Sequence, residues 1–132
     1  MKHLIFALAL TLFITPAHLI ACAILTGDYK IEGVKEGISQ GHEKHPDAKH
    51  CGKFKMTEKE IRKFFAKSKD ITPREKHDKY DWNPCQVTGT IVNGKEKADF
   101  IIYGSKIAEL KYPDGKKQWL GCKECGKPFF EF

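Results

Sequence analysis

No run of apolar residues in this 132-residue chain reaches the length of about 20 that a membrane-spanning helix requires. The apolar run that it does have, from Leu4 to Ile14, follows the positively charged Lys2 and is closely followed by Pro16. A short apolar run behind a basic start is typical of a secretion signal, which the mature protein loses. We therefore expect residues 1–22 to be a signal peptide and residues 23–132 to form a single domain.

The chain also lacks internal repeats, low-complexity tracts and the Gly-x-Ser-x-Gly motif of a nucleophile elbow. His77 and Asp78 have the chemistry of a general-base pair, but no nucleophile motif accompanies them. The CKEC motif near the end of the chain is followed by Gly126, whereas a haem attachment site has a histidine there. These absences favour a protein that is not an enzyme and carries no cofactor.

The end of the expected signal allows three cleavage sites. Leu19 to Cys22 resembles a bacterial lipobox, in which Cys22 is acylated and becomes the first mature residue. Cleavage after Ala23 or after Ala17 also fits signal-peptidase patterns. The five cysteines are an odd number, and an unpaired thiol is a liability in an oxidising compartment. The lipobox and the site after Ala23 both withdraw Cys22 and leave an even set.

The remaining cysteines are Cys51, Cys85, Cys122 and Cys125. Behind a signal peptide, disulfides are the usual state of cysteines in a small domain. Four cysteines allow three connectivities, and we expect bridges between separate segments, because closing a longer loop restricts the unfolded chain more. A four-thiolate zinc site and a redox-active pair at Cys122 and Cys125 remain as alternatives.

Two segments carry helix signals. Thr57 and Glu60 have the spacing of a capping box, and the apolar Ile61, Phe64 and Phe65 then fall on one helical face, which predicts a helix over about 57–68. Thr72 and Glu75 repeat the capping spacing around a proline, and predict a short second helix that continues to about residue 77.

Period-two patterns indicate strands elsewhere. We expect a weak strand over 26–34, a long exposed loop over 35–50, and four strands joined by tight turns within 85–92, 97–104, 105–112 and 116–122. The final PFFEF is expected to add a last strand. The residues expected to be buried are Val87, Ile91, Phe100, Ile102, Ile107, Leu110, Trp119 and Leu120. The predicted fold class is α+β: an antiparallel meander of about four to five strands, packed by one main helix and stapled by disulfides.

Two surface segments are candidate binding sites. Tyr80, Asp81 and Trp82 combine aromatic and polar groups of the kind that anchor protein partners. His42, His45 and His50 lie within ten residues of Cys51 and have the chemistry of a zinc or copper site. We expect only weak metal binding there, because an irregular loop does not hold imidazoles in a fixed geometry.

The skeleton of a cysteine and helix, then DWNPC, NG, CKEC and PFF, resembles small uncharacterised secreted cysteine-containing proteins of Gram-negative bacteria. The resemblance covers about residues 51–130 and brings no activity or catalytic residue with it. A chain of this size and architecture also resembles, in genre only, periplasmic immunity proteins and lysozyme inhibitors, which occlude the active site of a cell-wall enzyme.

The formal net charge of +6 favours acidic partners, and outside the cytoplasm these are not nucleic acids. Together these observations predict a non-enzymatic protein-binding domain in the periplasm, with Cys22 as an outer-membrane lipid anchor if the lipobox is used. Its expected partner is a secreted toxin or a cell-wall hydrolase. A periplasmic zinc or copper protein that uses the histidine segment, and a thiol oxidoreductase that uses Cys122 and Cys125, are the alternatives.

Overall fold

The computed structural model describes residues 23–130. Its elements, in chain order, are η2 (Ala23–Leu25), β1 (Lys30–Ile38), η3 (Pro46–Lys53), α1 (Glu58–Lys67), β2 (Lys69–Ile71), α2 (Pro73–Lys79), β3 (Cys85–Asn93), β4 (Glu96–Tyr103), β5 (Ile107–Lys111) and β6 (Lys117–Gly121), where η denotes a 3-10 helix. No helix within this part of the chain is long and apolar enough to cross a membrane.

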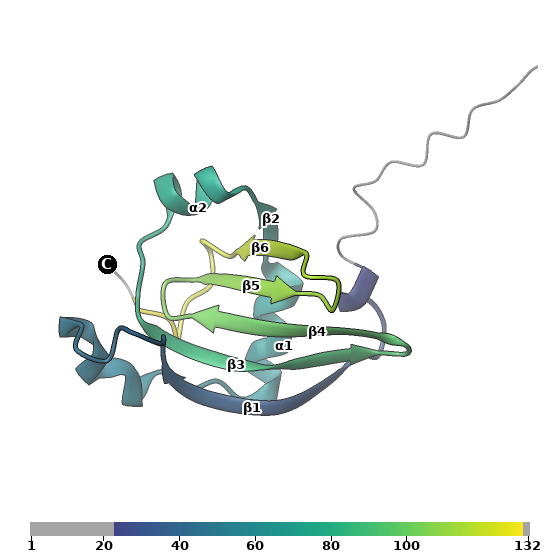
Figure 1. Ribbon diagram of the computed structural model, residues 1–132, viewed down its shortest axis with the longest axis horizontal. Helices are drawn as coiled ribbons and strands as arrows, with labels where there is room; N and C mark the ends of the chain where they lie inside the picture. Colours follow the sequence, from purple (N-terminus) through teal and green to yellow (C-terminus); the bar gives the residue numbers. More distant parts are fainter. Residues whose placement is uncertain (1–22, 131–132) are drawn as a thin grey trace, which may run out of the picture.

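The strands form one antiparallel sheet of six strands in the order β1-β3-β4-β5-β6-β2 (Figure 1). The α+β class, the antiparallel sheet and the disulfides are therefore confirmed. The expected count of four to five strands is too low, because the three-residue strand β2 also joins the sheet through β6. The segment β3 to β6 is the expected meander, and Gly94, in the β3–β4 turn, has a positive φ of 61° that favours glycine.

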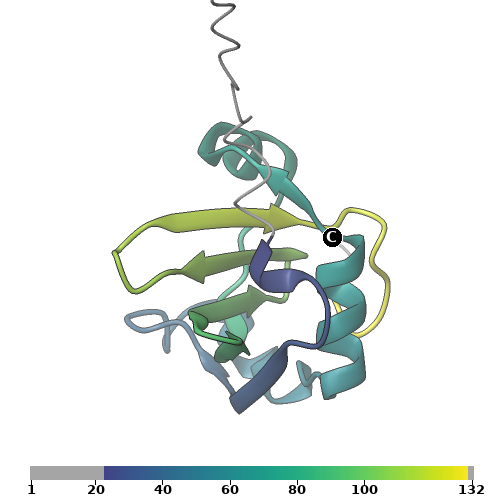
Figure 2. The same cartoon turned by 90° about the vertical axis from the view of Figure 1, so that its right-hand side faces the viewer.

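The two edge strands both precede β3 in the chain and pair with later segments. β1 pairs with β3 at one edge, and β2 pairs with β6 at the other. Between β1 and β2 the chain forms η3 and then α1. Helix α1 crosses behind the sheet (Figure 1). Figure 2, turned by 90°, shows α1 on one side of the sheet. We call this side the covered face and the opposite side the open face.

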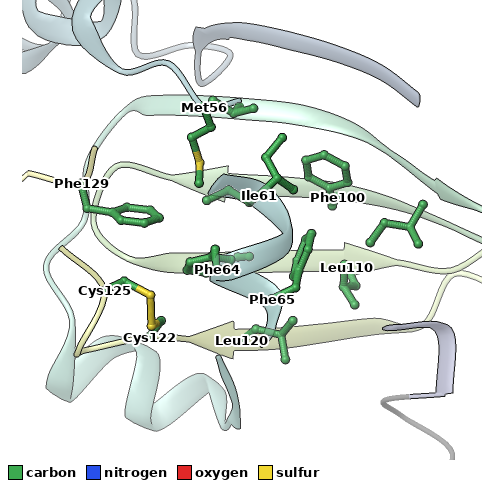
Figure 3. Close-up of a cluster of buried hydrophobic side chains, with 14 of the residues drawn as sticks. Met56, Ile61, Phe64, Phe65, Phe100, Leu110, Leu120, Cys122, Cys125 and Phe129 are labelled. Carbon is green, nitrogen blue, oxygen red and sulfur yellow. A yellow bond between two sulfur atoms is a disulfide. The ribbon is translucent and has the colours of Figure 1, made fainter. Parts of the chain in front are cut away.

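Helix α1 begins as its sequence predicts. The Thr57 side chain accepts a hydrogen bond from the Glu60 N–H at 3.2 Å, and the Glu60 carboxylate accepts one from the Thr57 N–H at 2.7 Å. The buried face of the helix then packs on the covered face of the sheet, where the ring centroids of Phe65 and Phe100 are 5.5 Å apart (Figure 3). All of the residues expected to be buried are so except Trp119, which is half-buried.

The described end of the chain is not the strand that PFFEF predicts. Phe129 enters the core, with its ring centroid 5.3 Å from that of Phe64 and 5.7 Å from that of Phe54. The Phe130 N–H donates to the Gly104 carbonyl at 3.1 Å. Burial of an aromatic ring under α1 therefore replaces strand pairing at this point; residues 131–132 lie outside the described part of the chain.

Candidate partner-binding site

Trp82 lies in the connection between α2 and β3 and is 42% exposed, although the residues that follow it are buried. The Asn83 side-chain oxygen accepts a hydrogen bond from the Cys85 N–H at 2.9 Å. The Ser39 N–H donates to the Pro84 carbonyl at 2.8 Å, which ties the connection to the end of β1. The indole is thus presented to solvent from a connection whose following residues, Asn83 to Cys85, are held by hydrogen bonds.

The histidine segment is exposed, but it is shorter than the long exposed loop expected over 35–50. Strand β1 continues to Ile38, and η3 begins at Pro46. The short remainder makes successive turns, in which the His42 N–H donates to the Ser39 carbonyl and the His45 N–H donates to the His42 carbonyl, each at 3.0 Å. The expectation was wrong because hydrogen bonds between residues three apart give order without any apolar periodicity.

The structure brings this segment to Trp82. The His42 ring centroid lies 4.5 Å from the nearer indole ring centroid, and the His45 ring approaches edge-on at 5.4 Å. The disulfide between Cys51 of η3 and Cys85 of β3 joins the two segments covalently, and both cysteines are buried. Two features that the sequence presents as separate are therefore one cluster, which we call the Trp82 cluster: Trp82, His42 and His45.

Tyr80 and Asp81 do not belong to this cluster. Tyr80 packs on Gly121 of β6, where a side chain larger than hydrogen would overlap the phenol ring. The Lys123 ammonium lies 4.8 Å from the centre of that ring. Burial raises the pKa of Tyr80 above its ordinary value, and the nearby Glu75 carboxylate adds to the shift. Asp81 is exposed. The candidate triplet Tyr80, Asp81 and Trp82 is thus divided between two surfaces.

The Trp82 cluster contains two of the three histidines considered as metal ligands, and no ring contact places His50 beside them. The His42 Nδ1 atom lies 3.1 Å from the Gln40 carbonyl oxygen, and the His45 Nδ1 atom accepts the Asp47 N–H at 3.2 Å. His50 lies exposed in η3. Within residues 23–130, no group of three or more histidine, cysteine, aspartate or glutamate side chains is placed to hold a metal ion.

The second disulfide joins Cys122 to Cys125, so the expectation that every bridge would link separate segments was wrong. The turn after β6 brings these cysteines together, because the Cys125 N–H donates to the Cys122 carbonyl at 3.2 Å. Their exposed fractions are only 3% and 7%, and the bridge lies against the core (Figure 3). A cavity of about 310 Å³ between α1 and the chain end reaches Cys125, and a second cavity of about 310 Å³, beside β2 and α2, reaches Cys122.

The other catalytic candidate is local to α2. The His77 Nδ1 atom lies 3.0 Å from an Asp78 carboxylate oxygen, and this contact lowers the pKa of Asp78. The two side chains are 88% and 53% exposed. The pair therefore stands in solvent.

The open face holds residues that reasoning from the sequence missed. Trp119 was expected in the core, but it lies on this face with Ile101 and Tyr103, all half-buried. The signal was present in ADFIIYG, where apolar side chains follow one another and so must point to both faces of a strand.

Comparisons with protein-family models, with curated proteins and with solved structures find no match to this chain.

Proposed function

We propose that this chain is a non-enzymatic protein-binding domain of the periplasm, which uses the Trp82 cluster to hold a secreted effector or a cell-wall hydrolase and neutralise it. The observation that carries the proposal is the exposed indole of Trp82 on a backbone fixed by a disulfide and buried neighbours. Tryptophan is enriched among the residues that dominate binding energy, and a rigid anchor loses little conformational entropy when it binds.

Export is part of the same proposal. The signal peptide and its candidate lipidation site, Cys22, lie outside the described residues. The two disulfides support an oxidising compartment, because such bridges are rare in proteins of the cytosol. A lipid on Cys22 would place the protein at the outer membrane, and no nucleic acid or cofactor enters the proposed function.

The test begins with cross-linking in the periplasm of cells that make the protein, followed by purification of the captured partner. Binding is then measured with three forms: the wild type, Trp82→Ala and Val34→Ala. Val34 is a matched control because it is the other large hydrophobic residue exposed in the described chain, at 41%. We expect Trp82→Ala to weaken binding about tenfold or more and Val34→Ala to leave it unchanged.

The purified partner also decides the class of function. We expect the wild-type protein to inhibit the partner's hydrolytic or toxic activity in stoichiometric amounts. Equal binding by the wild type and Trp82→Ala would remove the cluster from the proposal. A partner that is bound but keeps its full activity would contradict neutralisation.

Metal handling is the second candidate, because two imidazoles meet at one indole in the Trp82 cluster. His42 has the arrangement common in metal ligands, in which one ring nitrogen donates to a backbone carbonyl and leaves the other free. His45 does not, because its Nδ1 atom acts as an acceptor and the proton of the neutral ring is then on Nε2. Two ligands of opposite tautomer fall short of the three or four that zinc sites use.

A further inference from the structure

The open face has an apolar centre that no helix covers in its middle. The strand register places Thr88, Ile101, Glu109, Trp119 and Ile71 side by side across the five strands from β3 to β2. Three of these, Ile71, Ile101 and Trp119, are apolar and only half-buried. Figure 1 looks onto this face, with α1 behind the sheet and α2 displaced to one edge.

Two carboxylates of this face already have partners in the protein. Glu109, at its centre, is 8% exposed and pairs with the Lys117 ammonium at 3.0 Å. Asp99 accepts a hydrogen bond from the Thr90 hydroxyl at 2.9 Å. A partner that covers the face therefore does not need to bring a positive charge to Glu109.

Two lysines, in contrast, hold their charges against aromatic rings. The Lys76 ammonium of α2 lies 3.8 Å from the centre of the Trp119 ring, and Lys123 lies over Tyr80. Trp119 and Gly121 point to the same face of β6, and Tyr80 covers Gly121, so the two rings are neighbours. Contact with a ring holds an ammonium group in place while its outer side stays hydrated.

Four lysines lie at the rim of this face. Lys69, Lys76, Lys111 and Lys123 make no ion pair with a carboxylate anywhere in residues 23–130. The register places Lys69 beside Gly121 and Lys111 beside Lys117, so these charges border the apolar centre at both ends of β6. The register also places Lys111 opposite Asp99 of β4. The surface thus combines half-exposed apolar side chains with lysines that form no ion pair among the described residues.

We propose that the open face binds an acidic protein surface, in which carboxylates surround a projecting apolar side chain. The carboxylates complement Lys69, Lys76, Lys111 and Lys123, and the apolar side chain covers Ile101 and Trp119. Complementary charge of this kind steers encounter and excludes partners of the wrong sign. The proposal deepens the protein-binding function by naming the partner's chemistry and rests on that function, but it does not depend on the Trp82 cluster.

The experiment uses the oxidised mature protein and a displayed library of random peptides as the probe. We expect the selected peptides to be rich in aspartate and glutamate around an aromatic or aliphatic residue. A synthetic peptide with the selected sequence is then titrated into wild-type protein and two double variants. Lys76→Glu with Lys123→Glu reverses two charges on the open face, and Lys59→Glu with Lys63→Glu makes the same change on exposed positions of α1.

The open-face double variant is expected to bind the peptide at least about tenfold more weakly, while the α1 double variant binds as the wild type does. Affinity should also fall as salt is raised, because exposed charges are screened. Thermal melting of both variants shows that they remain folded. Selected peptides without acidic bias, or equal weakening by both variants, would overturn the proposal.

Two further measurements distinguish this proposal from binding through the Trp82 cluster and from binding to a membrane surface. Trp82→Ala is expected to bind the peptide normally, so that a failure of the Trp82 cluster and a failure of the open face give different results. Vesicles containing phosphatidylglycerol are tested with the same variants. Binding to vesicles that is lost in the open-face variant, without selection of acidic peptides, would show that the face meets a membrane surface and that the proposal is wrong.

Discussion

On β4, Phe100 and Ile102 point toward α1 and are 1% and 0% exposed, whereas their neighbours Ile101 and Tyr103 point to the open face and are half-buried. The same strand thus contributes apolar side chains to both faces of the sheet. The covered face is completed within the chain by α1, Phe54 and Phe129. The open face is completed only by α2 at one edge. Burial, and not the choice of side chain alone, therefore assigns stability to one face and leaves the other accessible for binding.

The largest effect on stability should come from alanine substitution of two neighbouring residues that point to opposite faces of the sheet. Phe100→Ala is expected to lower the free energy of unfolding by about 3–5 kcal/mol, because it leaves a cavity beside Phe65. Ile101→Ala on the open face should cost only about 1 kcal/mol, since its side chain already meets water. Denaturant unfolding of both variants makes the measurement. Equal losses would show that the open face is part of the stabilising core.

The next largest difference is expected between the two disulfides, in the free energy of unfolding that is lost when each is removed. Cys51 and Cys85 are 34 residues apart, whereas Cys122 and Cys125 are three apart. Loop-closure entropy then predicts a loss of about 4 kcal/mol when the first bridge is removed by a double Cys→Ala change, and about 2 kcal/mol for the second. Denaturant unfolding of the two double variants tests this order.

Insulin reduction by the wild-type protein is the accompanying control. We expect none, because the second bridge is nearly excluded from water. Turnover that disappears in Cys122→Ser would show that the short bridge is a redox centre, and the alternative function would then replace a structural role.

The smallest effect is expected from metal ions, because residues 23–130 contain no group of three or more side chains placed to hold one. Calorimetric titration of the oxidised protein with zinc or copper should show no binding tighter than micromolar, and melting with either ion should leave the stability unchanged. The physical reason is that two imidazoles at Trp82 do not complete a coordination shell. Tight one-to-one binding that is lost in a triple alanine variant of His42, His45 and His50 would favour metal handling.

The sequence predicted those parts of the fold that depend on neighbouring residues. The capping boxes at Thr57 and Thr72 and the Asn93-Gly94 turn are each specified within a few positions, and each has its expected place. Strand β2 was missed because its three residues carry no pattern of their own and are ordered by pairing with β6, about 50 positions away. The residues within and around β2 do not indicate which distant strand it pairs with.

The candidate site was less predictable for the same reason. Trp82 and His42 are 40 positions apart, and only the bridge from Cys51 to Cys85 and the ends of β1 and β3 bring them together. The exposure of Trp82 also depends on its buried neighbours, Asn83 and Pro84, which turn its side chain outward. The sequence around an aromatic residue that precedes a strand does not indicate whether its side chain is exposed, as in Trp82, or buried.

Strand β1 also sets how the protein would stand at a membrane. At its beginning, the Asn93 side-chain amide donates to the Ile24 and Thr26 carbonyls at 3.1 and 2.7 Å, which fastens the start of the described chain to the β3–β4 turn. At its end, Ile38 pairs with Cys85, next to the Trp82 cluster. Nine strand residues span about 30 Å. A lipid at Cys22 would thus hold the domain by one end and present Trp82 at the other, facing away from the bilayer.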